Sequence, residues 1–253
     1  MILHSNIIGE GTPFLVLHGF LGMGDNWKTL GNRFAQQGYE MHLIDQRNHG
    51  RSFHDDAFSY EVMAEDLRKY CEHHALDSFI LLGHSMGGKT AMEFAVTYPE
   101  MVTKLLVADI SPKEYPSHHH HILKALSQLD FDVINSRGKA DSVLAGYLDE
   151  IGVRQFLLKN LYWQEKGRLG LRMNLKVLTD KVEEVGKPLP KTAFFNNETL
   201  FLRGSRSDYI VPGDETLISH HFPAFQIVTI EGAGHWLHAE NPDKFFTIVL
   251  NFL

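Results

Sequence analysis

The chain has 253 residues, of which 43% are hydrophobic, and its formal net charge is −7 at pH 7. This length suits one large α/β domain or a core with an inserted subdomain, and the apolar share is ample for a buried core. Because contacts to nucleic acid and anionic membranes need clustered Lys and Arg, the negative charge gives no reason to expect either as a partner.

The first part of the chain alternates short apolar runs with amphipathic segments. The apolar runs are rich in leucine and β-branched residues on both faces, which is typical of buried parallel strands. We expect such strands at residues 13–19, 39–45, 78–85 and 102–109. We expect the helices between them at residues 25–37, 60–74 and 87–98, the last of which stops at a proline.

The alternation then breaks at residues 113–192, which are mainly helical in pattern and contain no convincing strand. We interpret this segment as an inserted helical cap, with residues 1–112 and 193–253 forming the core. The core pattern resumes with strands at 198–204 and 225–232 and helices at 214–221 and 242–253. The sequence therefore predicts an α/β fold with a mostly parallel, doubly wound sheet and functional groups at the carboxyl ends of its strands.

The turn after the third expected strand fits two motifs. Residues 83–87 read G-x-S-x-G, the nucleophile elbow that exposes a serine, here Ser85, between a strand and a helix. Residues 83–90 also fit the phosphate-binding loop G-x-x-x-x-G-K followed by Ser or Thr. An elbow would explain both glycines, because side chains at Gly83 and Gly87 would collide with the neighbouring strand and helix.

A phosphate loop would place Lys89 on the phosphates and Thr90 on magnesium. The bulky side chains of His84 and Met86 argue against it, because the backbone amides of such a loop must wrap a phosphate closely. We therefore favour the elbow, which leaves Lys89 as an ordinary residue of the first helical turn.

A serine nucleophile needs a base to take its proton and donors to hold the oxyanion that forms. The sequence supplies candidates for both. The Phe20 amide follows the first core strand, and the Met86 amide follows the serine, so the two can form an oxyanion hole. His235 follows the last strand in a glycine-rich loop that can bring its imidazole to Ser85.

Six segments together resemble the α/β-hydrolase superfamily and, within it, the small YbfF-type carboxylesterases. They are HGFLG, DQRNHGRS, GHSMGGK, VADISP, GVRQFLLKNL and GAGHWLHAENP. The resemblance covers nearly the whole chain and implies hydrolysis of short-chain acyl esters or thioesters through an acyl-enzyme, without a cofactor or metal. The same parts also serve thioesterases, carbon–carbon bond hydrolases and cofactor-free perhydrolases, and the fold can act as a small-molecule receptor.

Two carboxylates are candidates for the acid that hydrogen-bonds to the catalytic histidine. In many α/β-hydrolases the acid lies three residues after the glycine that ends the strand following the cap, but here Ser207 occupies that position and Asp208 comes one residue later. The resemblance to YbfF-type enzymes implies that Asp109 takes the acid role, with Ser207 as an auxiliary group. We favour Asp109 and keep Asp208 as the alternative.

Three other features have simpler interpretations. The loop at residues 45–52 is expected to be tied together by its own Arg and Asp. The run from His118 to His121 suits the start of a surface helix better than a zinc site, because consecutive helical residues point in different directions and cannot all bind one ion. Cys71 is the only cysteine and is expected to fill the core. With one cysteine, no signal-peptide pattern and no apolar run near 18 residues, we expect a cytoplasmic protein.

Overall fold

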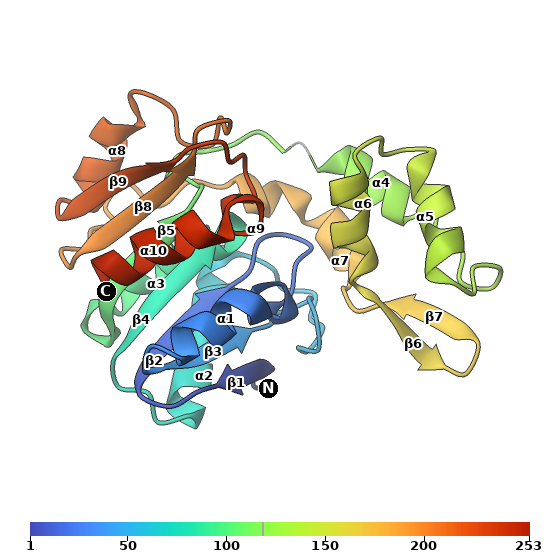
Figure 1. Ribbon diagram of the computed structural model, residues 1–253, viewed down its shortest axis with the longest axis horizontal. Coiled ribbons are helices and arrows are strands. Elements are labelled where there is room, and N and C mark those ends of the chain that lie inside the picture. Colours follow the sequence, from blue (N-terminus) through green and yellow to red (C-terminus); the bar gives the residue numbers. More distant parts are fainter. Residues whose placement is uncertain (118) are drawn as a thin grey trace.

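The computed structural model describes residues 1–117 and 119–253. Its main sheet has seven strands in the order β1-β3-β2-β4-β5-β8-β9 (Figure 1). They are β1 (Ser5–Ile8), β2 (Thr12–Leu17), β3 (Tyr39–Ile44), β4 (Phe79–His84), β5 (Val102–Ala108), β8 (Thr199–Gly204) and β9 (Phe225–Ile230). The strands pair in parallel except β1, which runs antiparallel to β3. The predicted α/β sheet is therefore confirmed, with β1 as an edge strand that the sequence reading missed.

Helices cover both faces of this sheet. On one face lie α1 (Lys28–Ala35) and α10 (Pro242–Phe252), and on the other lie α2 (Tyr60–His73), α3 (Met86–Thr97) and α8 (Asp214–His221). Alternate residues of β2 show the two faces, because Phe14 and Val16 pack into one core and Leu15 and Leu17 into the other. Burial on both faces explains why the strands read as continuous apolar runs.

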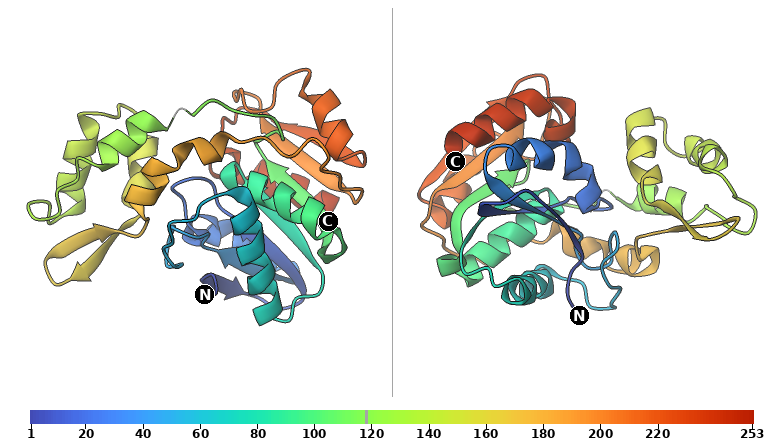
Figure 2. Two further views of the ribbon diagram at one scale, coloured as in Figure 1. Left: turned by 180° about the vertical axis from the view of Figure 1, so that it is seen from behind. Right: turned by 60° about the horizontal axis from the view of Figure 1, so that its bottom comes forward.

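The segment predicted to form the cap, residues 113–192, has its helices and hairpin to one side of the sheet (Figures 1 and 2). Its elements are α4 (His120–Leu126), α5 (Arg137–Ala145), α6 (Ile151–Leu158), β6 (Leu161–Glu165), β7 (Arg168–Leu171), α7 (Leu175–Asp180) and the 3-10 helix η3 (Val182–Gly186). Cap residues share a hydrophobic core with Phe20, Met63 and Met86, so the cap packs against the edge of the sheet where the expected site lies.

The cap segment is mainly helical, as predicted, but the expectation that it contains no strand was wrong. Strands β6 and β7 form an antiparallel hairpin in which Trp163 pairs with Leu169. Strand β6 was missed because the helical spacing of apolar residues in α6 continues past the end of that helix at Leu158. The turn depends on Gly167, whose φ of 88° lies in the left-handed region that glycine adopts at little cost. Within the described residues, no helix is long and apolar enough to cross a membrane.

Candidate active site

The predicted catalytic side chains meet at the carboxyl edge of the parallel sheet. Ser85 follows β4, Asp109 follows β5, and His235 lies in the loop between β9 and the short helix α9 (Leu237–Glu240). Strands β4 and β5 are neighbours, with His84 beside Ala108 in the register, so the residues after them emerge side by side. Parallel strands thus bring distant parts of the sequence to one point.

Ser85 sits on a sharp bend between β4 and α3. Its φ is 53° and its ψ is −118°, a conformation that costs a non-glycine residue about 1–3 kcal/mol. The bend needs small neighbours, because a Cβ on Gly83 would lie 2.1 Å from the Gly87 carbonyl oxygen, and one on Gly87 would lie 2.3 Å from that of Leu17. The backbone therefore has the shape of a nucleophile elbow, with the serine hydroxyl at its apex.

The imidazole of His235 joins the serine to a carboxylate. Its Nε2 lies 3.0 Å from Ser85 Oγ, and its Nδ1 lies 2.7 Å from Asp109 Oδ2. The Asp109 side chain is fully buried; its Oδ1 accepts from the Gly204 amide at 3.0 Å, and its Oδ2 also accepts from the Ser207 hydroxyl. Because the carboxylate accepts from Nδ1–H, the unprotonated Nε2 faces the serine, as a general base requires.

Of the two candidate acids, Asp109 is the one that contacts the imidazole, whereas Asp208 is exposed. The backbone of Asp109 also adopts a left-handed φ of 53°, and its amide donates a hydrogen bond to the Leu202 carbonyl at 2.7 Å. Tyr209 completes the arrangement by stacking on His235, with ring centroids 3.9 Å apart. Tyr209 was not predicted from the sequence, although it lies only two residues after Ser207.

The two amides expected to hold an oxyanion flank the serine. Met86 is the first residue of α3, where backbone N–H groups have no acceptor within the helix. The loop carrying Phe20 closely approaches the elbow, since a Cβ on Gly19 would lie 3.4 Å from Ser85 Cβ. Within residues 1–117 and 119–253, neither the Phe20 nor the Met86 amide donates a hydrogen bond to the protein. Both donors are therefore available to a ligand.

Two buried histidines hold the Phe20 loop. His18 donates from Nδ1 to the Gly19 carbonyl and accepts from the Gln46 amide at Nε2, with distances of 2.8 and 3.0 Å. His49 accepts at Nε2 from the Leu21 amide, 3.2 Å away. Burial lowers the pKa of His18 to about 4 and that of His49 to about 3. Both rings are therefore neutral at pH 7, which leaves each with the acceptor that the loop needs.

His49 belongs to the loop at residues 45–52, which was predicted to be tied together internally. The Asp45 carboxylate accepts from the amides of Gly24 and Arg51 at 2.7 and 2.8 Å. Arg47 instead forms two hydrogen bonds to Asp66 on α2, at 2.6 and 2.9 Å. The prediction therefore holds for Asp45, which binds the Arg51 amide within the loop, but it was wrong for Arg47, which fastens the loop to α2. The loop so held places the His49 ring against the Phe20 loop.

A second pair of buried histidines lies behind His235. His84 Nε2 donates to the His235 carbonyl at 2.8 Å, and His238 stacks on Trp27 with ring centroids 4.1 Å apart. Burial lowers the pKa of His238 to about 3 and lowers that of His84 well below its usual value. These neutral rings support the loop that carries His235 without adding a charge beside it.

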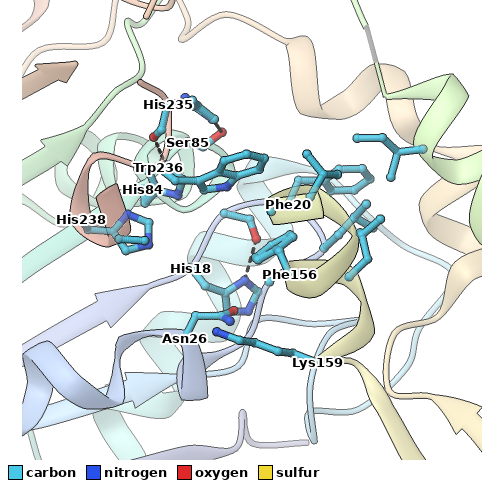
Figure 3. A pocket seen from close by; sticks show the side chains of 18 of the residues that line it. His18, Phe20, Asn26, His84, Ser85, Phe156, Lys159, His235, Trp236 and His238 are labelled. Carbon is cyan, nitrogen blue, oxygen red and sulfur yellow. Dashed lines mark hydrogen bonds between the residues drawn. The ribbon is translucent and has the colours of Figure 1, made fainter. Parts of the chain in front are cut away.

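A cavity of about 540 Å³ opens at the serine between core and cap (Figure 3). Core residues and helices α4 and α6 of the cap both contribute to its wall. Its apolar lining consists of Phe20, Leu21, Trp27, Ile122, Val153, Phe156, Leu157 and Trp236. Ser85 and His235 lie at one end in this view, and Asn26 and Lys159 lie at the other. The cavity suits a mainly apolar small molecule that presents a reactive group to the serine.

The rival phosphate loop does not fit this geometry. Lys89 is only 1% exposed, and its ammonium donates to the backbone carbonyls of Lys113 and Lys187. The Thr90 hydroxyl donates to the Met86 carbonyl at 3.1 Å. Neither side chain is therefore free to contact a phosphate. The expectation that Lys89 is an ordinary first-turn residue was also wrong, because it is buried against the cap connections.

Two residues of the histidine run, His119 and His121, belong to the lining of the cavity at the serine. His118 lies outside the described residues, while His120 begins α4 and its Nε2 lies 3.1 Å from Glu183. The described residues contain no cluster of three side chains suited to a metal ion. Cys71 is buried in the core, where burial raises the pKa of its thiol to about 12. Its thiol is therefore a core group, as expected.

Known proteins resemble this chain in sequence and in structure over nearly its whole length. Residues 12–139 match the family model of the alpha/beta hydrolase fold. The sn-1-specific diacylglycerol lipase ABHD11 of Mus musculus is 37% identical over 97% of this chain and 82% of that protein, and the esterase YbfF of Escherichia coli is 30% identical over 96% and 94%. A marine microorganism esterase of known structure, 40% identical, matches with a TM-score of 0.97 over 100% of both chains.

Proposed function

The chain belongs to the α/β-hydrolase fold family and is a carboxylic ester hydrolase, and we propose that it cleaves small esters with short acyl groups through an acyl-enzyme on Ser85. The observation that carries this proposal is that one imidazole contacts both a serine hydroxyl and a buried carboxylate. His235 Nε2 is 3.0 Å from the serine hydroxyl while its Nδ1 is 2.7 Å from the buried Asp109 carboxylate. This arrangement can activate an alcohol at neutral pH.

In the acylation step, Ser85 Oγ attacks the ester carbonyl carbon while His235 Nε2 takes the hydroxyl proton. The carbonyl oxygen becomes an oxyanion that the amides of Phe20 and Met86 stabilise. Asp109 holds the imidazole in the required tautomer and stabilises the imidazolium that forms. When the tetrahedral intermediate collapses, His235 returns the proton to the departing alcohol oxygen, and the acyl group remains on Ser85.

Deacylation repeats the same steps with water. Nε2 takes a proton from a water molecule as its oxygen attacks the acyl carbon, and the proton then passes to Ser85 Oγ as the carbon–oxygen bond breaks. The products are a carboxylic acid and the free enzyme. In this route every proton moves through one nitrogen atom, so loss of either Ser85 or His235 stops turnover.

The acyl group is proposed to occupy the apolar part of the cavity, whose lining includes Phe156 of the cap. An apolar lining makes burial of acyl carbon favourable, at about 0.8 kcal/mol for each CH₂ removed from water. We therefore propose that the cap determines acyl preference, with the core supplying the reacting groups.

A lipase-type activity is the second candidate. The relative from Mus musculus is named a diacylglycerol lipase, and the apolar lining shown by the cavity favours a lipid acyl chain over a polar acid. Thioesterase, carbon–carbon hydrolase and perhydrolase activities use the same groups, and a small-molecule receptor would bind without turnover. A cytoplasmic location also remains a proposal, supported by the single cysteine in the sequence.

A substrate panel tests these alternatives. Chromogenic acetate, butyrate, hexanoate and decanoate esters should be compared with a matched thioester and with diacylglycerol, using the Ser85→Ala variant as the control. We expect the highest kcat/KM on a short ester and almost complete loss of hydrolysis in Ser85→Ala. Faster cleavage of diacylglycerol or of the thioester would replace the proposed substrate class, and a fully active alanine variant would remove the mechanism.

A further inference from the structure

Two segments connect the cap to the core, and they run against each other. The Tyr115 amide on the outgoing segment donates to the Gly186 carbonyl at 2.8 Å, and the Leu189 amide on the returning segment donates to the Pro112 carbonyl at 2.9 Å. A Cβ on Gly186 would lie 2.1 Å from the Tyr115 carbonyl oxygen, so glycine is required for this approach. The cap is therefore attached to the core through two connecting segments that are hydrogen-bonded to each other.

Lys89 lies directly against this pair. Its Nζ donates to the Lys113 carbonyl on the outgoing segment and, at 2.7 Å, to the Lys187 carbonyl on the returning one. The ring of Tyr115 lies 5.2 Å from the same ammonium. Lys89 belongs to α3, the helix that follows the nucleophile, and its amide donates to the Ser85 carbonyl at 3.0 Å. One side chain thus joins both cap connections to the first turn after the serine.

We propose that Lys89 is a positioning residue for ester hydrolysis, which fastens both cap connections to the nucleophile helix and so fixes the cap wall of the cavity relative to Ser85. This inference rests on the proposed function, because it concerns how the acyl group is held. The cap contributes Ile122, Val153 and Phe156 to the cavity wall, whereas the groups that react belong to the core. Loosening the connections should therefore weaken acyl binding more than chemistry.

The surroundings of Lys89 explain why a side chain with several hydrogen-bond donors is used at this position. The pKa of the Lys89 side chain is lowered to about 7, because burial lowers it most strongly, Glu114 partly offsets this and Lys113 adds to the lowering. A small cavity of about 250 Å³ beside it is also lined by the ionisable groups of Tyr60, Glu61, Glu93, Lys187 and Lys191. Within the described residues no carboxylate forms a salt bridge with Lys89. Its main partners are the two carbonyls, which an apolar side chain would leave without a donor.

The test compares Lys89→Met, which keeps the length and loses the donors, with Lys89→Arg, which keeps a cation with several donors. For Lys89→Met we expect KM for a hexanoate ester to rise about tenfold, while kcat for an acetate ester stays within about threefold of wild type. Lys89→Arg should recover part of the KM effect. Lys191→Met is the matched control, because it replaces another lysine that lines the same small cavity but donates no described hydrogen bond to the two carbonyls, and it should behave as wild type.

Hydrogen exchange supplies a readout that does not depend on catalysis. In Lys89→Met the Tyr115 and Leu189 amides should exchange at least tenfold faster, while amides of β4 and β5 keep their protection. Unchanged exchange, or an equal loss of kcat at every acyl length, would overturn the proposal even if Ser85→Ala confirms the esterase mechanism. If Lys89→Met does not fold, the wild-type protein decides, because Tyr115 and Leu189 amides that exchange as fast as an exposed loop would rule out the fastened connection.

Discussion

Acidification should unfold this protein near pH 5, because its active-site loops depend on buried neutral histidines. His18, His49 and His238 have folded-state pKa values near 4, 3 and 3, against about 6.5 in an unfolded chain. The unfolded state therefore binds more protons below pH 6.5. The stability contributed by each histidine is complete above that pH and is lost as the pH falls toward the folded-state value.

The size of the effect follows from these values. Between pH 8 and pH 5, a histidine whose pKa falls from 6.5 to 4 or lower loses about 2 kcal/mol of stabilising free energy. Three such residues lose about 6 kcal/mol together, which is comparable with the total stability of many domains. Urea unfolding followed by circular dichroism at pH 8, 7, 6 and 5 measures this directly. A free energy of unfolding that stays constant over the range would refute the reasoning.

A single variant separates these histidines from other acid-sensitive groups. His238→Phe keeps an aromatic ring against Trp27 and removes one titrating side chain. The slope of unfolding free energy against pH should fall by about one proton, or about 1.4 kcal/mol per pH unit, in the region between pH 6 and pH 4. An unchanged slope would show that His238 is not neutral in the folded protein.

Five further substitutions test the site and its support. Asp109→Asn should lower kcat about a thousandfold or more by disturbing the histidine tautomer, whereas Asp208→Asn should leave kcat within about twofold; equal effects would contradict the choice of acid. Ser207→Ala removes one hydrogen bond to the acid and should lower kcat about three- to tenfold, and unchanged turnover would make Ser207 a bystander. Gly83→Ala should cost roughly 3 kcal/mol or more, seen as a Tm about 10 °C lower, and an unchanged Tm would mean that the elbow can relax. Phe156→Ala should raise KM for hexanoate more than for acetate, and equal shifts would place the acyl chain elsewhere.

Strands β2, β4, β5 and β8 were predictable because they are largely buried on both faces, which makes each one a continuous apolar run bounded by turns. The edge strand β1 was missed because it is short and only partly buried. The elbow glycines around Ser85 and the glycine-rich loop before His235 also carry a clear local signal. The hairpin at Trp163 and Leu169 did not, because its apolar residues continue the spacing of the preceding helix and a single glycine sets the turn.

The identity of the acid depends on backbone geometry that a sequence does not display. The family resemblance favoured Asp109, but the spacing alone left Asp208 open, because neither spacing nor residue type displays the left-handed φ of 53° at Asp109 or its contact with His235. The burial of Lys89 was equally hidden, because the carbonyls that it binds come from residues 24 and 98 positions away. Long-range contacts of this kind require the fold to be known.

The most direct test of the central claim is labelling with a fluorophosphonate, followed by mapping of the modified peptide. We predict one adduct per chain, located on Ser85, absent in Ser85→Ala and formed much more slowly in His235→Gln. An adduct on another residue, or labelling of His235→Gln at the wild-type rate, would contradict the claim that this imidazole activates this serine.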